Sequence, residues 1–247
     1  MQMRKLTSIL AASSLLALAA GGVANAAPAN TASWNGFYVG AVIGAQITGT
    51  NFALPGDTSD TLISNHDTNT GFIGGGVVGY NYQINNIVLG LEGDVIDANH
   101  SQRAVDCTVY GGCWSPAQDS FTTYNNLKEQ VGGHVRVRVG IATGRTLLYA
   151  AGGYSIQGTR LDLTGDCYDP DNPAVPQLYH FSRSKTLSGF NLGAGVEQAI
   201  TNHVILRAEY IYDDFGTQTY SGDGEEWNDR SLGVHSNNFR VGVSYKF

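Results

Sequence analysis

Alternation of apolar with small or polar residues is the clearest pattern in the sequence. It recurs in eight segments, each with apolar side chains at every second position. Within residues 131–141, for example, valines and an isoleucine alternate with His134, Arg136 and Arg138. A helix would scatter these charges around its circumference, whereas a strand places them all on one face. The pattern therefore predicts an all-β protein with eight strands.

The segments between the strands alternate in length. We expect long polar loops at about residues 48–69, 98–126, 158–184 and 216–235, and short turns at Asn85–Asn86, 143–145 and 201–203. This arrangement predicts an eight-stranded antiparallel transmembrane β-barrel with long extracellular loops and short periplasmic turns. A soluble barrel of the lipocalin kind would bury the apolar face instead. The soluble barrel is disfavoured because the inner face here would hold the charges of five strands. A soluble barrel could not desolvate these charges cheaply.

The inward face of the predicted barrel carries charges of both signs. The third and fourth predicted strands should pair, so their carboxylates and guanidiniums can meet, and the last two strands can likewise bring Glu209 to Arg240. An eight-stranded barrel is just wide enough for side chains to fill its interior. We therefore expect a lumen plugged by its own charge network, formed by Glu92, Asp94, His134, Arg136, Arg138, Glu197, Arg207, Glu209, Asp213 and Arg240.

The N-terminus has the features of a secretory signal peptide. Arg4 and Lys5 precede an apolar stretch over residues 9–20, and small residues follow up to Ala26. We place the signal peptide at residues 1–26, a short segment at 27–33 and the barrel at 34–247. Removing residues 1–26 takes away two positive charges, so the formal charge moves from -7 to -9. The predicted location is the outer membrane of a Gram-negative bacterium, and such an acidic chain is not expected to bind nucleic acid.

Several segments together resemble the small outer-membrane barrel family of alphaproteobacteria, which includes opacity-type porins and major surface antigens. The resemblance spans nearly the whole barrel. It rests on WNGFYVG (34–40), GYNYQ (79–83), LGLEGD (89–94), VRVRVG (135–140), Leu148–Tyr149, Gly152–Gly153, GAGVE (193–197), EYIYDDFG (209–216) and the terminal YKF (245–247). It implies an abundant, surface-exposed barrel with roles in envelope integrity and contact with a host or the environment. Some family members resemble haem binders.

The expected partners follow from this location. They are outer-membrane lipid and lipopolysaccharide, the barrel-assembly machinery, periplasmic chaperones and a surface ligand from the host or environment. The last strand ends in a phenylalanine, with apolar residues at every second position before it. We interpret Phe247, Tyr245 and Val243 as the signal that the assembly machinery reads.

Three cysteines fall in the predicted outer loops. Export to an oxidising compartment favours a disulfide between Cys107 and Cys113. Either of these could instead pair with Cys167, and one thiol is left over in every case. A zinc site is disfavoured because no C-x-x-C pair or nearby histidine set is present.

Four histidines also fall near predicted strand ends on the loop side: His66, His100, His180 and His235. The simplest interpretation is that they are solvated loop residues. The alternative is a haem or metal site at the extracellular mouth, since imidazole is a common ligand for both.

No pattern of nucleophile, base and orienting carboxylate indicates an enzyme, and no cofactor-binding motif is found. We therefore expect a structural and surface-interaction protein without a cofactor. The alternatives are a small-solute diffusion pore and a haem- or metal-binding receptor.

Overall fold

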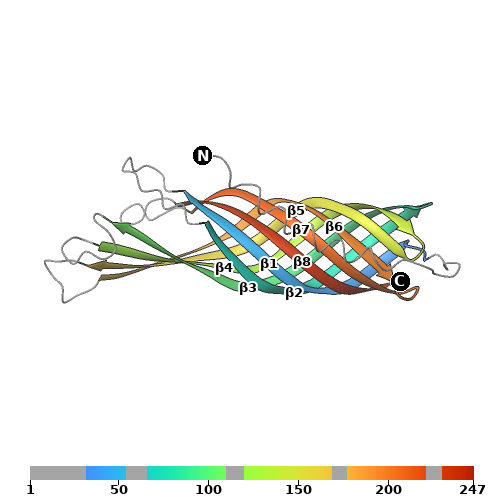
Figure 1. Cartoon of the computed structure of the whole chain (residues 1–247), viewed down its shortest axis with the longest axis horizontal. Helices are drawn as coiled ribbons and strands as arrows, with labels where there is room; N and C mark the ends of the chain where they lie inside the picture. Colours follow the sequence, from blue (N-terminus) through green and yellow to red (C-terminus); the bar gives the residue numbers. More distant parts are fainter. Residues whose placement is uncertain (1–31, 54–65, 110–119, 169–176, 221–229) are drawn as a thin grey trace, which may run out of the picture. The chain divides into compact units, whose positions relative to one another are not determined.

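The computed structural model describes residues 32–53, 66–109, 120–168, 177–220 and 230–247. In these residues the chain forms a closed antiparallel barrel in which each strand pairs with the next and β1 pairs with β8 (Figure 1). No helix in this part of the chain is long and apolar enough to cross a bilayer. The strands are β1 (Gly36–Ala53), β2 (His66–Ile84), β3 (Ile87–Val109), β4 (Ser120–Thr143), β5 (Thr146–Tyr168), β6 (Gln177–Ala199), β7 (Val204–Tyr220) and β8 (Arg230–Lys246). The predicted fold class is confirmed.

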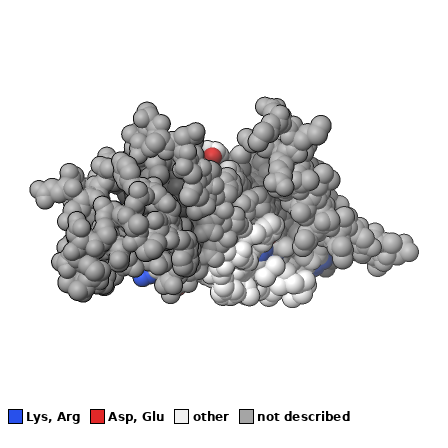
Figure 2. Space-filling view, turned by 60° about the vertical axis from the view of Figure 1, so that its left-hand side comes forward, with Lys and Arg blue, Asp and Glu red and all other residues white. Residues whose placement is uncertain are grey.

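The two faces of the barrel wall differ in the way that the alternation predicts. Leu91 and Val137 point outward with exposed fractions of 57% and 66%, whereas Glu92 and Arg136 beside them are only 2% and 1% exposed. Figure 2 shows one side of the molecule, where little of the described surface carries charge. The apolar residues therefore form the outer surface, as a barrel surrounded by lipid requires.

The strands are longer than the alternation predicted. β3 continues to Val109 and β4 begins at Ser120, although residues 98–126 were expected to form a loop. The other three predicted loops are shortened in the same way. The backbone ladder continues beyond the outward apolar band, into segments where polar residues become frequent and the period-2 signal weakens. Cys107, Cys167 and the four candidate histidines therefore lie in strands rather than in loops.

Two-residue turns join β2 to β3 and β4 to β5. Asn85 has a φ of 56° and Gly144 a φ of 61°. Asparagine and glycine adopt this left-handed conformation at the lowest cost, which explains why these residues mark the tight turns.

The last strand presents its alternating apolar residues on the outside. Val243, Tyr245 and Phe247 are all exposed. The backbone N–H of Phe247 donates to the carbonyl of Phe37 at 2.9 Å, which ties the end of the chain to the first strand. The role of these three residues in assembly remains a prediction.

Gly153 provides a test of how closely β5 packs against the backbone of β4 on the inner face of the wall. It pairs with Arg136 across β4 and β5, and a Cβ at this position would collide with the carbonyl oxygen of Val135. We expect Gly153→Ala to lower the free energy of unfolding by about 1–3 kcal/mol, the usual cost of overpacking. Urea unfolding of the refolded barrel in detergent measures this change.

The matched control is Gly93→Ala on the outward face of β3, where the nearest atom to a new Cβ is the carbonyl oxygen of His134 at 3.7 Å. This variant should unfold at the wild-type urea concentration. Equal midpoints for the two variants would contradict the assigned inner packing.

Candidate functional site

The barrel interior gathers all of the charged residues that the alternation assigned to it. Each of these ten side chains is buried. They come from five strands, so no single segment of the chain forms the cluster. The residues are Glu92 and Asp94 on β3, His134, Arg136 and Arg138 on β4, Glu197 on β6, Arg207, Glu209 and Asp213 on β7, and Arg240 on β8.

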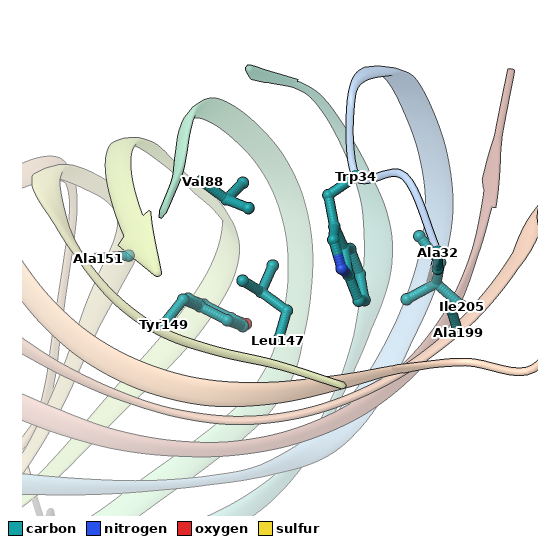
Figure 3. Close-up of a cluster of buried hydrophobic side chains, with 8 residues drawn as sticks. All are labelled: Ala32, Trp34, Val88, Leu147, Tyr149, Ala151, Ala199 and Ile205. Carbon is teal, nitrogen blue, oxygen red and sulfur yellow. The ribbon is translucent and has the colours of Figure 1, made fainter. Parts of the chain in front are cut away.

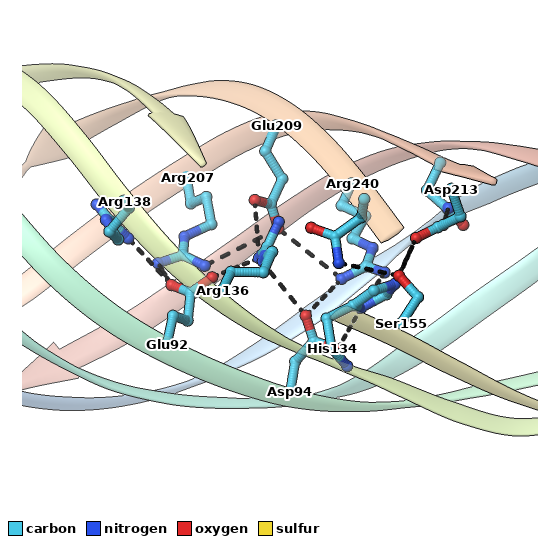
Figure 4. Close-up of polar contacts among 12 residues, drawn as sticks. Glu92, Asp94, His134, Arg136, Arg138, Ser155, Arg207, Glu209, Asp213 and Arg240 are labelled. Atoms are coloured by element: carbon cyan, nitrogen blue, oxygen red, sulfur yellow. Dashed lines mark hydrogen bonds and ion pairs between the residues drawn. The ribbon is translucent and has the colours of Figure 1, made fainter. Parts of the chain in front are cut away.

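Glu92 is at the centre of one half of this network (Figure 4). Its carboxylate contacts Arg136, the residue opposite it in the β3–β4 register. It also accepts hydrogen bonds from Nη1 of Arg138 at 3.0 Å and Nη2 of Arg207 at 2.6 Å. The hydroxyl of Tyr38 donates to the same carboxylate at 2.5 Å. One buried carboxylate thus connects β1, β3, β4 and β7.

Two further glutamates neutralise the guanidiniums around Glu92. Glu197 accepts hydrogen bonds from Arg138 at 2.9 Å and from Arg207 at 2.6 Å. The guanidinium nearest to Glu209 is that of Arg136, at 3.3 Å, and Arg240 lies 4.0 Å away. Glu209 and Arg240, which were expected to pair, are therefore within ion-pair distance, but Arg136 is the nearer partner.

His134 organises the other half of the network. Its Nδ1 lies 2.6 Å from Asp94 and its Nε2 lies 3.0 Å from Asp213. An ionised carboxylate only accepts hydrogen bonds, so both ring nitrogens must carry a proton. Arg240 donates to Asp94 at 3.0 Å, and its other terminal nitrogen lies 3.3 Å from Nδ1 of His134. The shorter contact of Nδ1 is to Asp94, so each ring nitrogen of His134 faces a carboxylate, an arrangement that suits a protonated imidazole.

Polar neighbours donate further hydrogen bonds to the carboxylate of Asp213. Ser155 donates to one carboxylate oxygen at 2.6 Å, and Ser236 and Asn238 donate to the other at 3.0 and 2.6 Å. Asn191 donates in turn to Ser155 at 2.9 Å. These bonds hold the carboxylate facing His134 (Figure 4).

The ten charges balance when His134 is protonated. Five carboxylates face four guanidiniums and one imidazolium. Buried charges are tolerated when they are paired and hydrogen-bonded, and an excess of one sign would be costly. The arrangement can fill and stabilise the interior.

Tyr149 is a contributor to the network that the sequence analysis did not identify. Its ring lies under the guanidinium of Arg138, 4.0 Å from the ring centre, and its hydroxyl donates to Glu209 at 3.0 Å. Tyr38 likewise lies 5.6 Å from both Arg138 and Arg207. Both tyrosines are buried on the inner face, but charge pattern alone gave no reason to assign either of them to the network.

Trp34 closes the end of the barrel that carries the short turns. Its side chain is fully buried and lies inside the lumen (Figure 3). It belongs to an apolar cluster drawn from the N-terminal segment and several strands: Ala32, Trp34, Val88, Leu147, Tyr149, Ala151, Ala199 and Ile205. The sequence analysis used Trp34 only as part of a family motif. The signal that could have predicted its position is the set of apolar residues at inward positions of β3, β5 and β7, which form an apolar site for the indole.

The segment before β1 is tied to the barrel by its backbone. The N–H of Ala32 donates to the carbonyl of Gly144 at 3.2 Å, and the N–H of Trp34 donates to Oε1 of Gln83 at 2.8 Å. The ammonium group of Lys246 contacts the carbonyl of Ser33. These bonds fix the position from which the indole enters the lumen.

The inner face also carries apolar side chains that the sequence analysis did not expect. They form a buried stripe on β1, β2 and β3: Tyr38, Val42, Ile73, Val77, Ile96 and Ala98. The side chains of these six residues, which point inward but lie in a separate cluster, pack against one another. The interior therefore combines the predicted charges with an apolar stripe in this sector.

The described cysteine positions bear on the disulfide hypothesis. Cys107 on β3 lies opposite Thr122, and Cys167 on β5 lies opposite Phe121. The strands β3 and β5 are separated by β4, so these two backbones are roughly 10 Å apart, beyond the 7 Å that a disulfide spans. Cys113 lies outside the described residues, and the Cys107–Cys113 bridge remains a prediction.

The four candidate histidines are distributed over separate strands. His66 is on β2, His100 on β3, His180 on β6 and His235 on β8. Among the residues that the structure describes, no three histidine, cysteine, aspartate or glutamate side chains are grouped to hold a metal ion. The haem or metal site remains a hypothesis without a supporting cluster.

Comparisons with known proteins identify the relatives of this chain. Residues 13–247 match the family described as outer membrane protein beta-barrel domain. The 31 kDa outer-membrane immunogenic protein of Brucella melitensis is 32% identical over 232 residues, which cover 90% of this chain and 87% of the relative. The 22 kDa outer membrane protein of Rhizobium leguminosarum is 31% identical over 216 residues, which cover 87% and 79%.

A further relative is the 25 kDa outer-membrane immunogenic protein of Brucella melitensis, 27% identical over 174 residues, which cover 70% of this chain and 64% of the relative. These relatives are outer-membrane proteins of alphaproteobacteria, in agreement with the predicted resemblance and location. The chain belongs to the outer membrane protein β-barrel domain family and is an outer-membrane barrel with surface-antigen-like relatives.

Proposed function

We propose that this protein is a closed structural barrel that anchors its long loops at the cell surface. The observation that carries the proposal is the buried, charge-balanced network that joins five strands across the lumen. Such a network favours a fixed scaffold over a passage for solutes, because moving an ion through it would separate paired charges.

The size of the barrel supports the same conclusion. Eight strands leave an interior that side chains can fill, whereas porins with aqueous channels have 16–18 strands. Trp34 and its apolar neighbours add a second obstruction at the short-turn end. The diffusion-pore alternative therefore has less support than the structural role.

The names of the relatives support a role at the cell surface. Two of them are called immunogenic outer-membrane proteins, which fits loops that are exposed outside the cell. The strand extensions beyond the apolar band would carry the loops of this chain away from the membrane. A host or environmental ligand would bind there, and the barrel-assembly machinery and periplasmic chaperones would deliver the chain to the membrane.

Conductance in planar bilayers tests the closed state. We expect the wild-type barrel to pass far less current than a general porin. The charge-balanced double variant Glu92→Ala/Arg136→Ala removes two central side chains and should increase the current. A large, steady wild-type current would contradict the proposal and favour the diffusion pore.

The matched control for conductance is Leu91→Ala/Val137→Ala. These two residues also face each other across β3 and β4, but on the outer surface. This variant should conduct like the wild type, since it leaves the lumen unchanged.

The stabilising role predicts a large cost for removing one central charge. Glu92→Gln leaves Arg136, Arg138 and Arg207 undercompensated. We expect the free energy of unfolding to fall by about 3–5 kcal/mol, as for other broken buried ion pairs. Urea unfolding in detergent measures the loss.

The control is Lys128→Ala, which breaks the Lys128–Asp162 ion pair, where the lysine is half-exposed. Exposed pairs contribute about 1 kcal/mol or less, so this variant should unfold almost like the wild type. A smaller loss for Glu92→Gln than for Lys128→Ala would argue against a stabilising network.

A further inference from the structure

Two cations lie on the outer surface of the barrel just beyond its apolar band. Lys128 on β4 and Arg160 on β5 face each other in the strand register. Their side chains are 47% and 46% exposed. Among the side chains that the structure describes on these two strands, the outermost large apolar residues that are exposed are Val131 and Ile156. Among the described side chains of β4 and β5, the two cations are therefore the first outward charges above the lipid-facing surface.

Their height matches the phosphate-bearing layer of a membrane. Arg160 is four residues beyond Ile156, which in a strand tilted by about 45° is a rise of roughly 9 Å. The polar headgroup region outside the hydrocarbon core is roughly 5–8 Å thick. A side chain starting at this height can reach a headgroup phosphate.

A partly buried carboxylate holds the two cations together. Asp162 accepts from Lys128 at 2.9 Å, from Nε of Arg160 at 3.0 Å and from Ser182 at 2.7 Å. Ser182 also accepts a hydrogen bond from Nε of Arg160, at 3.0 Å. Within the described residues only Nε of the guanidinium is engaged, so its two terminal nitrogens remain available to a ligand.

The cluster keeps a net positive charge. Burial would raise the pKa of Asp162, but the hydrogen bonds from Ser182, Lys128 and Arg160 outweigh it and lower the pKa to about 2. At neutral pH one carboxylate therefore faces two cations. The nearest outward carboxylate on β3 is Asp97, which lies lower, at the level of Val131.

We propose that Lys128 and Arg160 bind a phosphate group of an outer-leaflet glycolipid. A guanidinium presents paired donors that match phosphate oxygens, and the lysine adds a second charge on the same side. Ser182 and Asp162 orient the arginine without neutralising both cations. The site is independent of the closed lumen and requires only that the barrel lies in the outer membrane.

Native mass spectrometry of the detergent-refolded barrel with diphosphorylated lipid A tests this site. We expect Lys128→Ala/Arg160→Ala to raise the apparent Kd by about tenfold, the effect of losing charged hydrogen bonds. Lipid A without phosphates should bind the wild type as weakly as the double variant binds the phosphorylated form. If the double variant does not fold, Arg160→Gln replaces it, with a smaller rise in Kd expected.

The matched control is Arg183→Ala, which removes one cation at a similar height on the opposite face of the wall, across from buried Leu161. It should bind phosphorylated lipid A like the wild type. Equal binding of the two lipid A forms by the wild type would overturn the proposal. Displacement of the lipid by millimolar inorganic phosphate would also overturn it, by indicating a site for free anions.

Discussion

The balance of charge inside the barrel is the constraint on which the rest of the structure depends. Within the apolar band, a closed wall of eight strands with an apolar outer surface leaves its charged side chains no place except the interior. There they can stay charged only if each is paired and hydrogen-bonded. The geometry meets this condition with Glu92 among three guanidiniums and His134 between two aspartates. The strands are thereby joined across the lumen as well as along the wall.

The lumen changes in character along its length. Trp34 and its apolar neighbours fill the short-turn end, the charge network follows, and hydrogen-bonded polar residues surround Asp213 beyond it. An apolar stripe along β1–β3 covers one side. The charges therefore concentrate where several strands can contribute partners. This division explains how a narrow barrel holds the ten groups of the charge network without an excess of one sign.

The sequence was sufficient to predict the wall because alternation has a period of two, and a strand converts that period directly into two faces. Glu92, Arg136 and Arg240 could be placed inside on this basis. The contacts between distant strands, such as Arg240 with Asp94, depend on closure of the barrel and have no local signal. Trp34 was missed because it precedes the first strand. The strand ends were misplaced because alternation stops at the membrane surface while backbone pairing continues.

A double-mutant cycle at Glu92 and Arg136 tests the central claim most directly. The free energy of unfolding would be measured for the wild type, Glu92→Gln, Arg136→Met and the double variant. If the interior depends on paired charges, the double variant should lose less stability than the sum of the single losses, by at least about 1 kcal/mol. Strictly additive losses would mean that the two side chains act independently, and would contradict a network that stabilises the barrel through charge pairing.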